Sequence, residues 1–336
     1  MKTLHQKFSF KHCKQLSMRT LLCLAILGPL PAMAKDLDSQ SHYVQLTQGK
    51  AHFLQAGEGE PILMLHGIPT HAGLWSKLLP DLARIGNAVA LDFLGYGKSD
   101  KPLNSKYDFK SQYQFLSEFI ASQNYQDLTL VVTDLGSIIG IHYAIQHPER
   151  IKRLVILEGA YMPAQEWIQS ITPFQQMMFQ QMENPFMAQI ALVGMNPVPL
   201  FMSMFTKRPL SSQEILSYSS YFENPTIRQK VLLEGIGPAT IAKEIKSQIK
   251  GGLGEIMDQN AKGLQQSLIP ILLLKADPGL LIQKSQLDYA KQHFKSLTVE
   301  SIGEGIHYLS EDQPNRISNA ITLWVSKERV RLKFNL

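Results

Sequence analysis

Residues 130–140, Leu-Val-Val-Thr-Asp-Leu-Gly-Ser-Ile-Ile-Gly, set a single carboxylate between two apolar runs. The first run is β-branched and favours a strand, whereas residues 141–145 continue at helical spacing. This pattern predicts a strand, a sharp turn and a helix, with Asp134 at the turn. The N-terminus of such a helix favours negative charge, so Asp134 is a candidate nucleophile. A buried aspartate that caps the helix is the purely structural alternative.

Short apolar runs alternate with helical patterns along most of the chain. Besides the run before Asp134, they cover residues 43–46, 51–56, 62–65, 88–91, 154–157, 269–274 and 297–302. The first two are joined by a short turn and predict a hairpin at a sheet edge. The runs 62–65 and 88–91 are apolar on both faces and are separated by a helical pattern, which is typical of a parallel sheet covered by helices on both sides, and the same alternation continues along the chain. Leucines at helical spacing predict a helix across residues 74–82 as well, with others near 115–120 and 317–325.

The strand pattern stops near Met162 and has not resumed by Ala239, which indicates an insertion between two strands of the sheet. We predict that this insertion is a helical cap. The predicted parts are a leader (1–34), a first core part (35–161), the cap (162–239) and a second core part (240–336). The cap is rich in methionine: Met162, Met177, Met178, Met182, Met187, Met195, Met202 and Met204. Methionine fills irregular cores and also lines sites for apolar ligands, and both interpretations stay open.

The N-terminus has the composition of a secretory signal peptide. Five cationic residues precede the apolar run 21–27, and Ala32-Met33-Ala34 then provides a cleavage site after Ala34. We therefore expect an exported protein, periplasmic or secreted, with no membrane segment after cleavage; Met18 is an alternative start. Both cysteines, Cys13 and Cys23, lie in this leader, so the mature chain is expected to have no disulfide.

The net charge of +5 comes from the same leader. Five of the 33 basic residues lie there, which leaves 28 basic against 28 acidic residues in the rest of the chain. No basic surface for nucleic acid is therefore expected.

Three further patterns place polar groups where strands end. His66-Gly67-Ile68-Pro69 follows one apolar run, Glu158 ends another, and His307 comes just after the last. The carboxyl ends of parallel strands meet at one edge of a sheet, so these groups are expected to lie near Asp134. Any one of them alone is more often a structural or surface residue, but the order nucleophile, acid and histidine is that of a hydrolase.

Taken together, these motifs resemble the haloalkane dehalogenases of the α/β-hydrolase superfamily, and epoxide hydrolases share much of the pattern. The matching segments are His66-Gly67-x-Pro69-Thr70, Asp92-x-x-Gly95-x-Gly97-Lys98-Ser99-Asp100-Lys101-Pro102, the Asp134 turn, Glu158, Asp277-Pro278-Gly279, His307-Tyr308-x-x-Glu311-Asp312 and, in the cap, Arg208-Pro209-Leu210-Ser211 with Phe222-x-Asn224-Pro225. The resemblance implies an α/β-hydrolase fold: a mostly parallel eight-stranded sheet flanked by helices, with an inserted helical cap. It covers nearly the whole mature chain.

The resemblance also implies roles. Asp134 would attack an electrophilic carbon of a small apolar substrate and form an ester, which water activated by His307 would hydrolyse. Glu158 would orient the imidazole, with Asp277 as the alternative acid because it also follows a strand. The backbone N–H groups of Ile68 and Leu135 would form the oxyanion hole. No cofactor and no metal is implied.

Two residues depart from the dehalogenase pattern. Dehalogenases usually hold the halide with a tryptophan directly after the nucleophile and with an asparagine or a second tryptophan elsewhere. This chain has Leu135 after Asp134, and Ile68 where the relevant branch carries the asparagine. Losing one preorganised donor typically costs about 3 kcal/mol of transition-state stabilisation, so two losses would cripple ordinary dehalogenation. Trp167 in the cap is a candidate replacement donor.

Epoxide hydrolases need hydroxyl donors instead, and Tyr161, Tyr218 and Tyr221 are candidates for contacts with a substrate or its leaving group. Epoxide hydrolysis is therefore the alternative activity. A non-catalytic ligand-binding protein on the same fold is a further one. The chain is expected to be a monomer or a homodimer.

Overall fold

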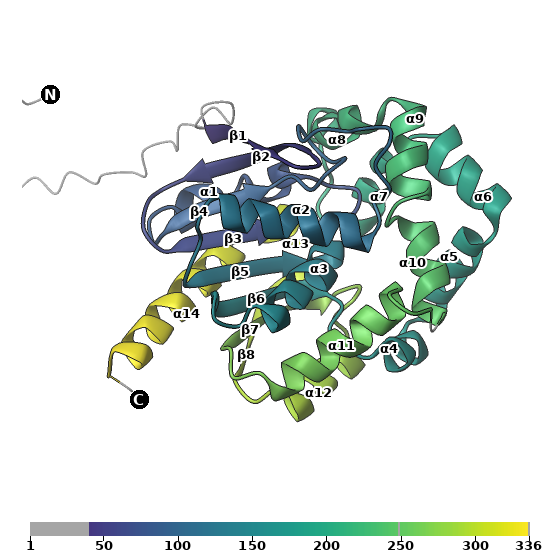
Figure 1. Cartoon of the computed structure of the whole chain (residues 1–336). Helices are drawn as coiled ribbons and strands as arrows, with labels where there is room; N and C mark the ends of the chain where they lie inside the picture. Colours follow the sequence, from purple (N-terminus) through teal and green to yellow (C-terminus); the bar gives the residue numbers. More distant parts are fainter. Residues whose placement is uncertain (1–39, 248, 335–336) are drawn as a thin grey trace, which may run out of the picture. The chain divides into compact units, whose positions relative to one another are not determined.

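The computed structural model describes residues 40–247 and 249–334, with side chains up to residue 331. The predicted signal peptide and both cysteines lie outside the described residues. A single sheet forms the centre of this part of the chain (Figure 1). Its strands are β1 (Ser41–Leu46), β2 (Gly49–Ala56), β3 (Pro61–Leu65), β4 (Asn87–Leu91), β5 (Leu128–Thr133), β6 (Ile151–Gly159), β7 (Ile271–Pro278) and β8 (Leu297–Gly305).

The eight strands follow the order β1-β2-β4-β3-β5-β6-β7-β8. β1 and β2 pair in antiparallel fashion, as the hairpin predicted for one edge, and β2 also pairs antiparallel with β4. All pairs among β3 to β8 are parallel. Every residue of β3 and β5 is buried. Strands buried on both faces are what a parallel sheet between helix layers requires, so the predicted fold class is confirmed.

Two groups of helices cover the sheet. In one group α3 packs against β5, β6, α2 and α11; in the other α14 packs against α1, β7 and β8. The bounds of the core helices are α1 (Leu79–Leu82), α2 (Phe109–Ser122), α3 (Asp134–Gln146), α11 (Leu253–Gln266), α12 (Lys284–His293), α13 (Leu309–Asp312) and α14 (Pro314–Phe334).

The helix predicted across residues 74–82 is wrong as a single element. A 3₁₀ turn, η2 (Ala72–Trp75), and the one-turn helix α1 take its place. Pro80 explains the break, because it has no N–H to donate and its ring excludes a helical residue four positions earlier. It is tolerated in the first turn of α1, where it lies.

The chain between β6 and β7 forms a set of short helices, drawn from teal to green in Figure 1. Its elements are α4 (Ala164–Ser170), α5 (Pro173–Glu183), α6 (Pro185–Gln189), η3 (Ile190–Gly194), α7 (Val198–Phe205), α8 (Ser212–Ser219), η4 (Ser220–Phe222), α9 (Pro225–Arg228), η5 (Gln229–Leu233) and α10 (Pro238–Lys246). Prolines in the first turns of α5, α6, α7, α9 and α10 start new helices and prevent the preceding ones from continuing. Below, residues 162–246 are called the cap.

Among the described helices, no single one is long and apolar enough to cross a membrane. Pro185–Gly194 and Val198–Phe205 reach that length and composition only as a pair, which is bent by 95°.

Candidate active site

Asp134 lies at the tip of the turn between β5 and α3. Its φ of +47° is in the left-handed region, which is uncommon for a residue with a side chain. The opposing loop approaches so closely that a Cβ on Gly67 would stand 2.2 Å from the Cβ of Asp134. Only glycine fits at residue 67 while Asp134 keeps this position.

The two carboxylate oxygens of Asp134 have different partners. Oδ1 accepts the N–H of Ile68 at 2.8 Å, and the N–H of Leu135 also donates to the carboxylate. Oδ2 lies 3.4 Å from Nε2 of His307. Thr133, and not Asp134, occupies the N-cap of α3, so the geometry does not match the capping alternative. One oxygen is held by the backbone N–H of Ile68, while the other faces the histidine.

His307 follows β8 and lies between two carboxylates. Its Nδ1 is 3.4 Å from Oε2 of Glu158, a long contact of the kind that active sites without substrate often show. Glu158 has a φ of +37° and no exposed surface. Its Oε2 accepts the N–H groups of Leu280 and Leu281 at 2.8 and 2.7 Å. Asp277, the alternative acid, lies near the end of β7 and is exposed to solvent. The structure therefore brings Glu158, not Asp277, to the histidine.

The charges of the two carboxylates act on the imidazole. Burial alone would lower the pKa of His307, but Asp134 and Glu158 stabilise its cation and raise the pKa to about 9. Burial alone would likewise raise the pKa of Asp134, yet His307 and the N–H groups of Ile68 and Leu135 hold it below its usual value. Asp134 is therefore an anion at neutral pH, as a carboxylate nucleophile must be.

Asp134 and His307 open into a cavity of about 150 Å³ between the core and the cap. The wall is mainly apolar: Ile68, Leu135, Ile138, Ala160, Met178, Phe179, Met182, Phe201, Phe205, Pro238, Ile241, Ile245, Leu280 and Leu281 line it together with Trp167, Gln175 and Tyr308. Such a wall suits a small apolar molecule.

The cap methionines divide between the two interpretations left open. Met178 and Met182 line the cavity. Met162 and Met202 are buried in the core, and Met177, Met187, Met195 and Met204 are exposed.

Two side chains of the cavity wall, Trp167 and Tyr308, have a polar hydrogen that can be donated to a bound molecule. The indole N–H of Trp167 is buried without a hydrogen-bond partner in the described part of the chain. The hydroxyl of Tyr308 reaches only the carbonyl of Ile68, at 3.4 Å. Burial and the charge of Asp134 raise the pKa of Tyr308 well above its usual value, so the hydroxyl stays protonated. Gln175 is committed, because its Nε2 donates to the carbonyl of Leu280 at 2.9 Å.

The expectation that three tyrosines contact the substrate is not met by their positions, since none of them lines this cavity. Tyr161 is buried against Phe294. Tyr218 donates to Glu311 at 2.6 Å, because its buried hydroxyl needs an acceptor. The Tyr221 ring packs on His71, 4.7 Å between centroids. Tyr218 and Tyr221 instead line a separate cavity of about 320 Å³.

The hydroxyl that does line the cavity, Tyr308, was not singled out for a role from the sequence. Its position next to His307 was the available indication. Within residues 40–247 and 249–334, no group of three or more His, Asp or Glu side chains is arranged to hold a metal ion.

Comparison with known proteins agrees with this architecture. The sequence model of the α/β hydrolase fold family matches residues 60–314. A haloalkane dehalogenase of Mesorhizobium japonicum is 29% identical over 307 residues, covering 88% of this chain and 94% of its own. One from Agrobacterium fabrum is 27% identical over 290 residues, with 82% and 88% covered.

Solved structures show the same fold. The haloalkane dehalogenase DbeA from Bradyrhizobium elkani superimposes with a TM-score of 0.79 at 24% identity, covering 86% of this chain and 98% of its own. DatA from Agrobacterium tumefaciens gives a TM-score of 0.76 at 23% identity, with 86% and 96% covered. The chain belongs to the α/β hydrolase fold family. Within that family it is a haloalkane dehalogenase-like hydrolase.

Proposed function

We propose that this protein is an exported hydrolase that opens a small apolar electrophile through an ester on Asp134. The observation that carries the proposal is that the two carboxylate oxygens of Asp134 have different partners. Oδ1 accepts the backbone N–H of Ile68, Oδ2 lies 3.4 Å from Nε2 of His307, and both Asp134 and His307 line the apolar cavity. A carboxylate held in this way is fixed for attack on a carbon atom in the cavity.

The first step is a displacement. Oδ2 of Asp134 bonds to the electrophilic carbon, and the bond from that carbon to its leaving group breaks with both electrons going to the leaving group. In the second step His307 takes a proton from water, and the resulting hydroxide adds to the carbonyl carbon of the ester. The N–H groups of Ile68 and Leu135 bind the oxyanion. When the adduct collapses, the bond between the carbonyl carbon and the alkyl oxygen breaks, and the imidazolium of His307 gives its proton to that oxygen, which releases the alcohol. The new carboxyl group of Asp134 loses its proton to water and is a carboxylate again.

We propose that Glu158 orients His307 in the second step. Its carboxylate is fixed by the N–H groups of Leu280 and Leu281 and can accept the Nδ1–H of the imidazole. The tautomer with a free Nε2, which faces Asp134, is then the favoured one.

The leaving group decides between two activities. Ile68 and Leu135 offer no side-chain donor for a halide, which leaves the Trp167 N–H as the replacement donor. Epoxide opening is the second candidate, and the protonated Tyr308 hydroxyl in the cavity favours it. In that reaction the departing oxygen stays attached to the product and accepts the hydrogen bond from Tyr308.

Export and assembly are also proposals. The basic, apolar and Ala-x-Ala segments of residues 1–34 support export. N-terminal sequencing of protein recovered from the periplasm or the medium tests it, with Lys35 as the expected first residue. Sedimentation equilibrium distinguishes a monomer from a homodimer.

The test of the mechanism is single-turnover incubation of His307→Gln protein with 1-bromobutane and, separately, with styrene oxide. Intact and peptide mass spectrometry then locate any adduct. An adduct on the peptide that contains Asp134 is expected, and it must be absent from the Asp134→Asn control. The electrophile that forms it chooses between the two activities. The proposal would be wrong if wild-type protein were inactive on a broad panel of halides and epoxides and the folded His307→Gln variant formed no adduct. The protein would then be interpreted as a ligand-binding protein.

A further inference from the structure

The loop that carries His307 is attached to the cap by its backbone. The N–H groups of His307 and Tyr308 both donate to the carbonyl of Phe205, at 3.0 and 3.2 Å. Phe205 ends α7, and its ring lies against both the His307 and the Tyr308 ring. The backbone N–H of the histidine is therefore bonded to the cap and not to the sheet, while its carbonyl accepts the N–H of Leu309 in its own loop.

Asp312 extends this attachment by one turn. Its Oδ1 accepts the N–H groups of Lys207 and Arg208, at 2.8 and 3.0 Å. Its Oδ2 is within 3.4 Å of the N–H of Ile306, on the other side of the histidine. One carboxylate thus connects the chain on both sides of His307 with the cap residues after α7.

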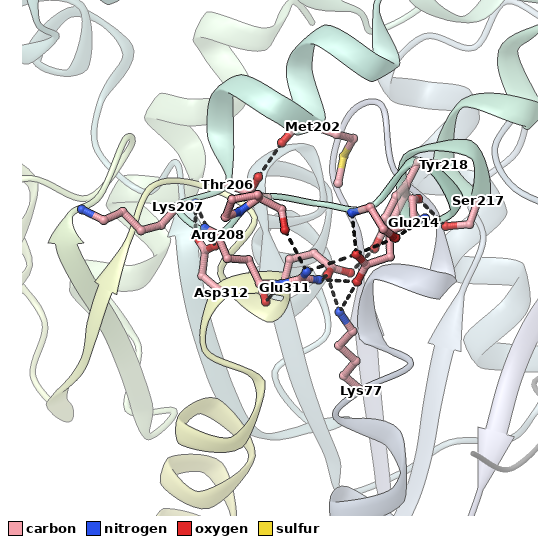
Figure 2. Close-up of polar contacts among 12 residues, drawn as sticks. Lys77, Met202, Thr206, Lys207, Arg208, Glu214, Ser217, Tyr218, Glu311 and Asp312 are labelled. Carbon is pink, nitrogen blue, oxygen red and sulfur yellow. Dashed lines mark hydrogen bonds and ion pairs between the residues drawn. The ribbon is translucent and has the colours of Figure 1, made fainter. Parts of the chain in front are cut away.

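Glu311 connects the same loop to side chains. Figure 2 shows its carboxylate between Lys77, Arg208 and Tyr218. Oε2 accepts Lys77 Nζ at 2.5 Å and the Arg208 guanidinium, and Oε1 accepts the Tyr218 hydroxyl at 2.6 Å. Arg208 also donates through Nε to the backbone carbonyl of Glu311, at 2.8 Å.

Glu214 of the cap completes the cluster by pairing with both cations, Lys77 and Arg208. Two cations therefore face two anions, contributed by the core, the cap and the histidine loop. Only 4% of the Glu311 side chain is exposed. Removing one partner of a buried pair strands the other charge, so such a cluster resists separation far more than an exposed ion pair.

We propose that Glu311 and Arg208 are positioning residues that fix the His307 loop to the cap and so set the place of the imidazole. The proposal rests on the proposed function, in which His307 acts only in ester hydrolysis. Asp134 forms the ester without help from the imidazole. Loosening the cluster should therefore slow hydrolysis and spare ester formation. A displacement of about 1 Å can cost roughly a hundredfold in rate.

The kinetic test compares Glu311→Gln and Arg208→Met with Arg208→Lys, which keeps the charge but not the fork of donors. Glu234→Gln is the matched control, because its pair with Lys230 lies on the exposed surface of the cap. Single-turnover rates of ester formation are expected within about twofold of wild type in all variants. Ester hydrolysis is expected to fall at least tenfold in the first two and less in Arg208→Lys. An equal fall in both steps overturns the proposal.

Amide hydrogen exchange gives a readout that needs no turnover. Exchange of the peptide around residues 302–312 is expected to accelerate in Glu311→Gln, while peptides from β5 and β6 stay protected. Unchanged exchange around His307 overturns the proposal. If Glu311→Gln does not fold, Arg208→Met carries the same test, since a third of the Arg208 side chain is already exposed.

The two proposals fail separately. If wild-type protein forms no ester from either electrophile, the proposed function fails, and the exchange measurement alone decides whether the attachment exists. If the ester forms and both half-reactions respond equally, the attachment fails and the proposed function stands.

Discussion

Nδ1 of His307 lies 3.4 Å from Oε2 of Glu158, although 149 positions separate the two residues in the chain. The carboxylate is fixed independently of the histidine, because Oε2 also accepts two backbone N–H groups from the loop after β7. Glu158 can therefore hold the imidazole in one orientation while Asp134 changes from anion to ester and back.

Glu158→Gln should slow ester hydrolysis by roughly 10² to 10⁴, because the amide cannot stabilise the imidazolium and can favour the wrong tautomer. The ester on Asp134 is expected to accumulate in mass spectra. Asp277→Asn is the matched control and should stay within about twofold of wild type, since Asp277 is exposed. The reverse pattern would make Asp277 the acid.

The pKa of His307 should depend on the charge of Asp134. It is raised to about 9 in the free protein, and Asp134→Asn should lower it, as should ester formation, because one flanking anion disappears. Titration of ¹³C-labelled histidine by NMR measures the first effect. Ester hydrolysis should therefore rise with pH through a midpoint below 9. An identical pKa in Asp134→Asn would contradict the assigned contact.

The same shift makes a prediction about stability. Because the pKa of His307 is raised on folding from its ordinary 6.5 to about 9, its contribution to stability is complete below pH 6.5 and is lost as the pH rises through about 9. His307→Gln should remove this part of the alkaline decline in the free energy of unfolding. Urea titrations at pH 6 and pH 9.5 on both proteins provide the comparison.

Ile68→Asn should raise ester formation from a bromoalkane by about tenfold, because it adds an amide donor next to Asp134 where dehalogenases usually carry one. The Ile68 side chain already lines the cavity, so the donor faces the reacting centre. Ile138→Asn places the same amide elsewhere on the wall and is the control. Equal gains in both variants would show a general effect of polarity.

Glu60 is not part of the active-site cavity, but its ion pairs should contribute to the free energy of unfolding. It pairs with Lys152 at 2.7 Å and with Arg153 at 2.6 Å, and the Arg153 side chain is fully buried. Breaking a buried pair costs roughly 3–5 kcal/mol. With 28% of the Glu60 side chain still exposed, we expect Glu60→Gln to lose about 2 kcal/mol in urea unfolding. Asp288→Asn breaks an exposed pair with Lys284 and should leave stability close to wild type.

Low pH should reduce the stability that Glu60 contributes through its ion pairs with Lys152 and Arg153. Burial alone would raise the pKa of Glu60, but Lys152 and Arg153 lower it from 4.5 to about 2. Its stabilisation is therefore present above pH 4.5 and lost as the pH falls toward 2. Glu60→Gln should show a smaller loss of stability over that interval.

The positions of Asp134, Glu158 and His307 could be predicted because each is a local event, a strand that ends at a polar residue. Parallel pairing then brings strand ends to one edge, and the structure places the three side chains together. The choice between Glu158 and Asp277 could not be made in this way, since both follow strands. The choice depends on which carboxylate accepts the backbone N–H groups of the loop after β7, and these groups donate to Glu158.

The cap was less predictable for a physical reason. Its prolines divide it into short helices, and the direction of each depends on packing and not on periodicity. Tyr218 and Tyr221 were expected at the substrate and lie in another cavity instead. The cluster around Glu311 was also invisible, because it joins three segments distant in sequence. Only the tertiary structure determines such contacts.

The hydrogen bonds from His307 and Tyr308 to Phe205 limit how the cap of this chain can be exchanged with that of a relative. Caps are often treated as exchangeable modules that change specificity while the catalytic core is kept. Here Lys207 and Asp312, 105 positions apart, belong to one hydrogen-bonded unit. A chimera that takes a cap from a relative should work only if residues 306–312 come from the same parent. The two segments are thus expected to be inherited as a pair.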